Sequence, residues 1–139
     1  MRTPRSVAPA TFMHPPLADG HAGLRHVFVR DLLVACRIGV HSHEKRREQP
    51  VRINLDLAVR EGATDDKLAQ VVDYEVIVER VRRIAGRGHV NLLETLAERI
   101  AEACLDDARV RAARVRAEKL DVFPDAASVG VEIERFART

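Results

Sequence analysis

Lys119 is a lysine in a chain that carries almost all of its positive charge on arginine. Only three of the 23 basic residues are lysines. An arginine keeps its proton under ordinary conditions, whereas a partly desolvated lysine can release one. A proton-transfer step would therefore require lysine at this position. The alternative is an ordinary exposed lysine near the end of a strand, and the residue type alone leaves both interpretations open.

Glu94 is a second candidate, near the start of a segment whose apolar residues recur at helical spacing, NLLETLAERIAEACLDD (residues 91–107). Asn91 followed three residues later by glutamate is typical of a capping box, and we expect Glu94 to cap the helix on this pattern alone. The functional alternative is that the free amides at the helix start favour a planar heterocycle. A carboxylate there can accept paired N–H donors from a cyclic guanidine-like group.

Tyr74 and Glu44 are weaker candidates by themselves. Tyr74 is the only tyrosine and stands at the start of a predicted helix, where it can either pack with its hydroxyl in water or meet a ligand. Glu44 ends the segment HSHE (residues 41–44) and is either a solvated loop charge or a site carboxylate. The alternate histidines suggest a metal, but zinc needs three or four ligands and the chain offers few others, so we expect no metal site.

The elements that must position these residues follow from hydrophobic periodicity. Alternating apolar residues are clearest in VRINLDLAV (residues 51–59). Asp73 is a plausible helix cap and Gly86 a plausible helix end. Strands are expected over residues 26–36, 51–59, 109–123 and 127–136, and helices over 73–88 and 91–107. This ββααββ order predicts the α+β class, with a four-stranded antiparallel sheet and two helices on one face. The open sheet edges favour a homo-oligomer that pairs them.

Composition bounds the other function classes. The chain has 139 residues, 46% hydrophobic and 32% charged, which fits one domain. We expect a flexible proline-rich tail over residues 1–24 and a single domain over 25–139. The formal charge of +2, the spread of the 20 arginines and the 4% aromatic content predict no nucleic-acid partner. No 18-residue apolar run occurs, so we expect no membrane span. Two cysteines without a C-x-x-C motif favour a reduced, cytoplasmic setting.

Four segments, taken together and in order, resemble the dihydroneopterin aldolases, pterin-processing enzymes of folate biosynthesis. The segments are IGVHSHEKRREQ, VVDYEVIVERV, VNLLETLAERIA and AEKLDVFPDAASVGVEIER. The resemblance covers about residues 26–136. It implies the tunnelling (T-) fold, in which ββααββ units close their sheets into a barrel as a tetramer or octamer. It also implies a small-molecule pterin substrate, sites at subunit interfaces and no cofactor.

The resemblance also assigns binding roles. Glu94 in NLLE resembles the family's pterin anchor, which holds the 2-amino and N3 hydrogens, with the Leu93 backbone beside it. Tyr74 in VDY resembles the site tyrosine that is supplied across a subunit boundary. Val72 and Val40 fall where the family lines its pocket with backbone or small apolar contacts.

The catalytic roles implied by the resemblance fall on Lys119, Tyr74 and Glu44. Lys119 is similar to the catalytic lysine, and Glu44 to the carboxylate near the substrate's polyol tail. The expected reaction is retro-aldol cleavage of 7,8-dihydroneopterin, in which the ring imine of the substrate absorbs the electrons, so that no metal is needed. Lys119, Tyr74 and an ordered water would move the protons while Glu44 orients the diol.

The sequence leaves three alternatives open. Many aldolases follow the lysine with proline, whereas here Leu120 follows Lys119, and this stretch is similar to the sister family of dihydroneopterin triphosphate 2′-epimerases. NLLETLAERIA favours the aldolase. A zinc-dependent T-fold enzyme similar to 6-pyruvoyl tetrahydropterin synthase would use the HSH segment. A non-catalytic oligomeric binding module, for example for RNA, would use the arginines.

Overall fold

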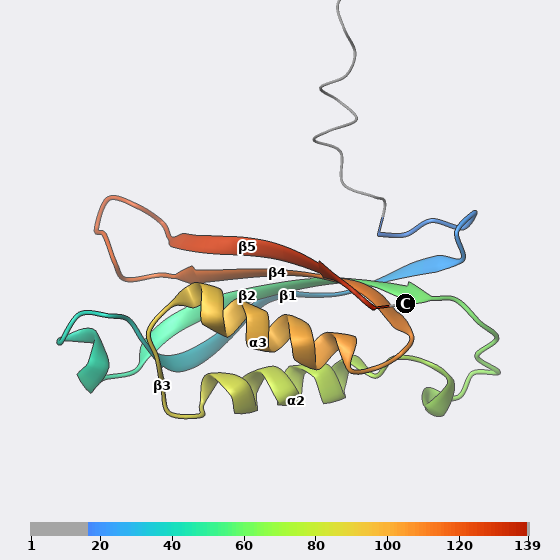
Figure 1. Ribbon diagram of the computed structural model, residues 1–139, viewed down its shortest axis with the longest axis horizontal. Coiled ribbons are helices and arrows are strands. Elements are labelled where there is room, and N and C mark those ends of the chain that lie inside the picture. The colour runs from blue at the N-terminus through green and yellow to red at the C-terminus, as the bar shows by residue number, and fades with distance from the viewer. Residues whose placement is uncertain (1–16, 139) are drawn as a thin grey trace, which may run out of the picture.

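The computed structural model describes residues 17–138 of the chain. One long sheet forms one layer and two helices form the other (Figure 1). The α+β class is confirmed, and so is the ββααββ order of the long elements, with one short additional strand between the helices. The elements are β1 (Leu24–Ile38), β2 (Gln49–Arg60), α2 (Tyr74–Ala85), β3 (His89–Val90), α3 (Leu93–Leu105), β4 (Val110–Lys119) and β5 (Val129–Phe136), with short 3-10 turns η1 (Glu44–Arg46) and η2 (Leu68–Gln70).

The sheet has five strands in the order β3-β1-β2-β4-β5. The four long strands are antiparallel neighbours, as the periodicity predicts. The additional strand, β3, pairs in parallel with the end of β1, where Arg37 lies opposite His89 and Ile38 opposite Val90. Two residues are too few for a periodic pattern, so the expected four-stranded sheet lacked this strand.

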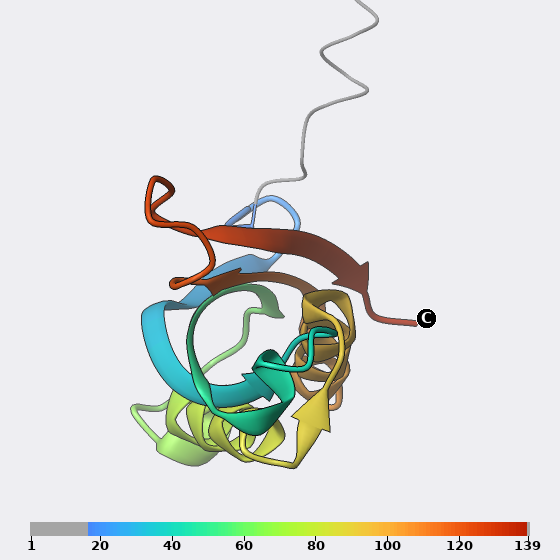
Figure 2. The same ribbon diagram turned by 90° about the vertical axis from the view of Figure 1, so that its left-hand side faces the viewer.

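The core lies between the sheet and the helices. The apolar residues of β2 alternate as the sequence predicts, and all of them are buried: Val51, Ile53, Leu55, Leu57 and Val59. From α3, the side chains of Leu96 and Ile100 meet this layer, and from α2 the side chain of Val81. The sheet curls around both helices, which cover one face only (Figure 2). The polar residues of β2 therefore lie on the other face, away from the helices.

The two helices begin differently. Asp73 caps α2, because its side chain accepts a hydrogen bond from the amide of Glu75 at 2.9 Å, and Gly86 ends the helix as predicted. The predicted capping box at α3 is wrong. The N-cap of α3 is Leu92, in extended conformation, and no side chain caps this end. The pairing of β3 with β1 holds the chain extended through Val90. The helix therefore starts one residue later than it would if Asn91 were its N-cap.

The expected tail, residues 1–24, lies mainly outside the described residues. Within them, an isolated bridge joins Asp19 to Leu24 and closes a turn onto the start of β1. Across residues 17–138, neither helix has the length and apolar character needed to cross a bilayer.

Candidate active site

Glu44 and Lys119 meet although 75 residues separate them in the chain. Lys119 is the last residue of β4, and Glu44 opens the η1 turn. The lysine Nζ donates to Glu44 Oε2 at 2.8 Å. Glu44 is only 7% exposed, which is unusual for a loop carboxylate and requires partners. The alternative of a solvated loop charge is therefore wrong for Glu44, and so is an ordinary exposed position for Lys119, whose side chain is 15% exposed.

Two further donors hold the Glu44 carboxylate. The Gln49 side-chain amide donates to Oε2 at 3.1 Å and also to the Ile38 carbonyl at 2.6 Å. The His41 amide donates to Oε1 at 3.4 Å. The hydrogen bond from Lys119 is the main cause that lowers the pKa of Glu44 to about 2, against the opposing effect of burial, and Gln49 and His41 add to it. Glu44 is thus a charged acceptor at neutral pH.

Gly39 makes room for this carboxylate. Its φ is +134°, a conformation that favours glycine, and a Cβ built on it would lie 2.2 Å from the Cδ of Glu44. The sequence pattern indicated only that Gly39 and Gln49 stand at the two ends of a charged loop. Their roles depend on the fold of that loop around Glu44, and neither residue was predicted as part of the site.

Hydrogen bonds hold the segment before α3 next to Gly39, close in sequence to the η1 turn. The Gly39 amide donates to the Val90 carbonyl at 3.0 Å, and His89 Nε2 lies 2.8 Å from the Gly39 carbonyl as donor. The η1 turn, β3 and the loop after β4 gather at this end of the molecule (Figure 2). Leu93 and Glu94 follow β3 directly and form the first turn of α3. One chain therefore brings Glu44, Lys119, Leu93 and Glu94 to the same end.

Glu94 itself is exposed, and within residues 17–138 its carboxylate has no hydrogen-bond or ion-pair partner. The amides at the start of α3 receive no side-chain cap. Val40, which follows Gly39, is also exposed at this end. A free carboxylate beside uncapped amides can bind a ligand that presents both N–H donors and an acceptor.

Tyr74 and Val72 lie elsewhere. Tyr74 opens α2, whose 12 residues separate it from the β3 end by about 18 Å. Its side chain is 61% exposed. Val72 is 5% exposed because its side chain packs into the core, so only its backbone can meet a ligand. A single chain therefore does not bring these two residues to Glu44 and Lys119.

A second buried carboxylate, Glu118, lies next to Lys119 but on the opposite face of the sheet. Arg52 donates to it twice, through Nε and Nη2 at 3.0 Å each, and the Ser128 hydroxyl donates at 2.6 Å. The Arg52 guanidinium is the main cause that lowers the pKa of Glu118 to about 2. The sequence pattern gave no signal for this cluster, because a glutamate in a strand of alternating charges is ordinarily exposed.

The HSH segment does not assemble a metal centre within the described part of the chain, where no group of three or more His, Cys, Asp or Glu side chains converges. His41 and His43 stack with ring centroids 5.7 Å apart, and both are exposed. Cys36 and Cys104 are buried and unpaired.

Comparisons with known proteins identify the family of this chain. The family model described as dihydroneopterin aldolase matches residues 27–134. A dihydroneopterin aldolase of Streptomyces coelicolor is 39% identical over 97 residues, which cover 68% of this chain and 82% of that protein. A Burkholderia thailendensis dihydroneopterin aldolase, solved bound to guanine, superposes with a TM-score of 0.74 at 39% identity, covering 84% of this chain and 94% of that chain.

The Escherichia coli dihydroneopterin aldolase, solved in complex with neopterin, superposes with a TM-score of 0.73 at 29% identity. The match covers 80% of this chain and 98% of that chain. These likenesses confirm the predicted fold: the curled sheet with its two helices is a T-fold half-barrel.

Proposed function

The chain belongs to the dihydroneopterin aldolase family of carbon–carbon lyases, and we propose that it cleaves 7,8-dihydroneopterin into 6-hydroxymethyl-7,8-dihydropterin and glycolaldehyde. The observation that carries the proposal is the contact between Lys119 Nζ and the buried Glu44 carboxylate at 2.8 Å. This pair stands at the end of the molecule where Leu93 and Glu94 open α3. The proposal assigns the proton-transfer role and the ring-binding role to these two groups acting on one ligand.

Glu94 binds the pterin ring in this proposal. Its exposed carboxylate accepts the 2-amino and N3 hydrogens, and the Leu93 backbone lies beside it. Guanine and neopterin, the ligands in the two similar structures, share this 2-amino-pyrimidinone edge. The uncapped amides of α3 favour the partial negative charge on the ring's acceptor atoms.

The cleavage needs only proton transfers from the protein. The 2′-hydroxyl loses its proton as the C1′–C2′ bond breaks, and the C2′ fragment leaves as glycolaldehyde. The electron pair passes from C1′ into the ring imine, which gives an enamine, and C1′ then takes up a proton. Because the substrate accepts the electrons itself, the proposed reaction uses neither a metal nor a cofactor.

Glu44 and Lys119 act on the diol in this scheme. Glu44 is a charged acceptor, so a substrate hydroxyl can replace one of its present donors and become oriented. Lys119, already within hydrogen-bond distance of the same carboxylate oxygen, then faces the diol and moves the protons with Tyr74 and an ordered water. Val40 and the Val72 backbone complete the pocket.

The proposal includes a homo-oligomer, tetramer or octamer, because Tyr74 lies a helix length from Lys119 within one chain. Tyr74 and Val72 of one subunit then complete the site of the next. Edge pairing of the open sheet would bring the subunits together.

Subunit complementation tests this arrangement. Tyr74→Phe and Lys119→Ala variants are each expected to be impaired, and mixed oligomers should regain activity because some sites receive both native residues. No recovery after verified mixing would contradict a shared site.

The reaction is tested by incubating the protein with dihydroneopterin and with its triphosphate, while glycolaldehyde and the 2′-epimer are both measured. Lys119→Ala should lose turnover and keep pterin binding, whereas Glu94→Ala should lose binding. Full turnover by Lys119→Ala would refute the catalytic assignment. Leu120 after Lys119 favours the epimerase as the second candidate. Epimer formed without net glycolaldehyde release would establish that outcome instead.

A further inference from the structure

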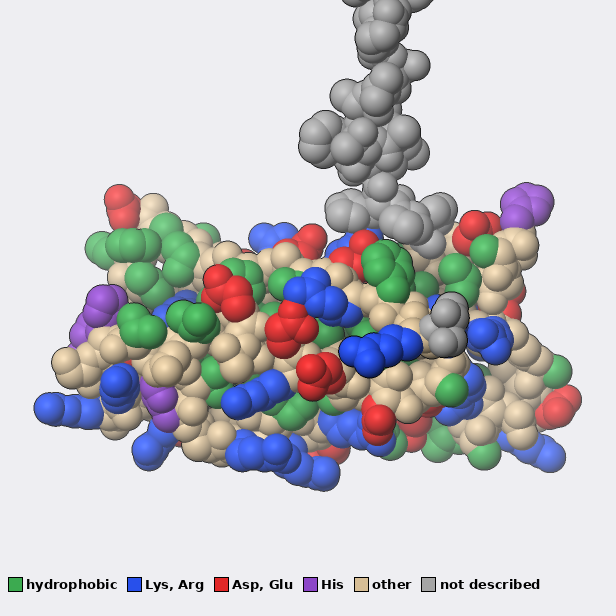
Figure 3. Space-filling model, viewed as in Figure 1, with side chains coloured by type: hydrophobic (Ala, Val, Ile, Leu, Met, Phe, Trp, Pro, Cys, Tyr) green, Lys and Arg blue, Asp and Glu red, His purple; other side chains and the backbone are tan. Residues whose placement is uncertain are grey.

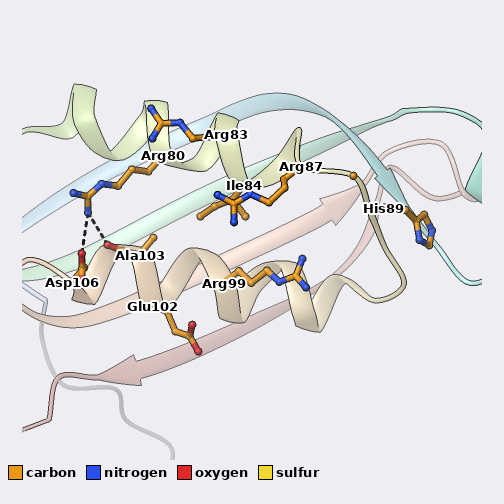
Figure 4. A pocket seen from close by; sticks show the side chains of 10 residues that line it. Arg80, Arg83, Ile84, Arg87, His89, Arg99, Glu102, Ala103 and Asp106 are labelled. Atoms are coloured by element: carbon orange, nitrogen blue, oxygen red, sulfur yellow. Dashed lines mark hydrogen bonds and ion pairs between the residues drawn. The ribbon is translucent and has the colours of Figure 1, made fainter.

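A groove runs between α2 and α3 on the side of the molecule that faces away from the sheet. It is an open surface groove with a volume of about 870 Å³. Figure 4 shows that its lining residues come from both helices and from the segment between them. Basic side chains dominate the lining: Arg80, Arg83, Arg87, His89 and Arg99. Glu102 and Asp106 are the acidic lining residues.

Three of these arginines lack a neutralising partner. Arg83, Arg87 and Arg99 make no side-chain hydrogen bond or ion pair within residues 17–138, and all three are exposed. In contrast, Arg80 donates to the Ala103 carbonyl at 3.2 Å and lies 3.9 Å from Asp106. Because all three line the same groove, a bound anion would reduce the repulsion among their charges.

The arrangement follows from helical spacing. Arg80, Arg83 and Arg87 stand at intervals of three and four residues, so the first two share one face of α2 and the third follows just after its end. Arg99 faces them from α3. Lys and Arg side chains gather along the margin of the molecule formed by α2 (Figure 3). Although the arginines are spread along the sequence, folding collects four of them here.

We propose that this groove binds a polyphosphate, a ligand with two or more linked phosphate groups, free or as part of a nucleotide-like molecule. The planar guanidinium forks match phosphate oxygens bidentately, which an ammonium does not do. The axes of packed helices lie about 8–10 Å apart. Arginines on both helices can therefore each contact a different phosphate of a chain, whereas a single small anion cannot reach them all. The ligand occupies the Arg83, Arg87 and Arg99 part of the groove, because Glu102 and Asp106 repel anions from the rest.

Nucleic acid is the less favoured occupant. An extended phosphate backbone needs a continuous basic stripe, whereas the two carboxylates interrupt this one, and the chain's formal charge is only +2. Base stacking is also unsupported, because no aromatic side chain is among the residues that line the groove apart from the His89 ring.

The test is calorimetric titration of the full-length protein with inorganic tripolyphosphate at about 150 mM salt, where exposed charges more than about 8 Å apart are screened. Saturable binding is expected. The variant Arg83→Gln/Arg87→Gln should weaken it by at least about tenfold, because two charge-assisted contacts are lost. The matched control is Arg82→Gln/Lys67→Gln, which removes two positive charges outside the groove and should leave affinity within about twofold. Arg82 pairs with Glu79 at 2.7 Å instead of lining the groove.

Three results would overturn the proposal. One is the absence of saturable tripolyphosphate binding. Another is equal weakening in the groove variant and the control variant, which would indicate a non-specific charge effect. The third is tighter binding of a single-stranded RNA of matched total charge through the same arginines, which would make the groove a nucleic-acid site. Retained folding of both variants is checked by circular dichroism and melting temperature, and Arg99→Gln serves as a second groove variant if the first unfolds. No pterin is present in these titrations, so their outcome is independent of the proposed reaction.

Discussion

Two buried carboxylates, Glu44 and Glu118, lie on opposite sides of the strand β4 that ends in Lys119. They are 7% and 4% exposed, and the pKa of each is lowered to about 2. Their partners differ: Glu44 faces the Lys119 ammonium, whereas Glu118 faces the forked guanidinium of Arg52. Burial and a low pKa are therefore common to both glutamates, and the cation that each one meets is what distinguishes them.

The difference follows from the chemistry of the two cations. Arg52 donates two fixed parallel hydrogen bonds, and the Ser128 hydroxyl adds a third, so Glu118 is saturated and fastens the loop after β4 to β2. The Lys119 ammonium has three rotatable N–H donors, and one of them donates to Glu44, so the group can turn toward a substrate hydroxyl without breaking a fork. The Arg52–Glu118 cluster is suited to stability, and the Lys119–Glu44 pair is suited to proton transfer.

Exchanging the two cation types should produce the largest effect. Lys119→Arg keeps the positive charge beside Glu44 but cannot transfer a proton, so kcat should fall by about 10²–10⁴-fold. Arg52→Lys loses the fork to Glu118, so the free energy of unfolding should fall by about 1–2 kcal/mol with turnover unchanged. Steady-state assays and urea denaturation measure the two quantities. An active Lys119→Arg enzyme, or an Arg52→Lys protein that is stable but inactive, would reverse the roles of the two clusters.

Gly39→Ala should displace Glu44. The added Cβ would lie 2.2 Å from the Glu44 Cδ, so the carboxylate must move, and turnover should fall by about 10–100-fold because a shift of about 1 Å misplaces the diol. Gly88→Ala is the matched control, because Gly88 also has a positive φ, +64°, and nothing lies within 4 Å of the added atom. It should lose about 1–2 kcal/mol of stability from backbone strain and keep its turnover. Equal turnover losses in both variants would show that strain, and not the position of Glu44, matters.

The parts of the fold that the sequence predicted are those in which a local pattern reports burial directly. The alternation over residues 51–59 and the Asp73 cap are examples, and both are confirmed. The predicted start of α3 was wrong, because a contact between segments distant in the sequence determines where this helix begins. His89 and Val90 pair with the end of β1, and this pairing overrides the capping tendency of Asn91.

The site could be predicted only in part. Lys119 could be predicted because it is a lysine in a chain rich in arginine, and Glu44 and Glu94 because they lie in the HSHE and NLLE segments. Gly39 and Gln49 were not predicted, because one matters for the space it leaves and the other for a hydrogen bond inside a folded loop. The basic groove was also missed, although the spacing of the arginines on α2 is a local signal that sequence reasoning could have used.

The acid sensitivity of the protein should depend on both carboxylates. A glutamate titrates near 4.3 in the unfolded chain and at about 2 in these two places. The unfolded chain therefore binds more protons between these values. Each ionised carboxylate therefore adds on the order of a few kcal/mol to the free energy of unfolding. This contribution is fully present above about pH 4.3 and is lost as the pH falls through about 2. Urea midpoints measured between pH 5 and 2 should fall for the native protein.

Glu44→Gln and Glu118→Gln should each flatten that fall, and the double variant should flatten it further. Some slope will remain. Burial raises the pKa of Asp56, but Arg30 and His26 together lower it below its usual value, and Arg109 lowers the pKa of Asp107. Only Glu44→Gln should also impair turnover at neutral pH. An unchanged pH slope in both single variants would mean that neither carboxylate titrates at an unusually low pH in the folded protein.

The smallest effects should come from the third partners of the two carboxylates. Ser128→Ala removes one hydrogen bond from Glu118 and should cost about 1 kcal/mol of stability with no change in turnover, because the Arg52 fork remains. Gln49→Leu removes the amide that holds Glu44 and leaves the Ile38 carbonyl without its donor, so stability should fall by a similar amount or more. Turnover should also fall several-fold, because Glu44 keeps its charge but loses its orientation. A turnover loss confined to Ser128→Ala would place the reacting end of the substrate on the opposite face of the sheet, beside Glu118.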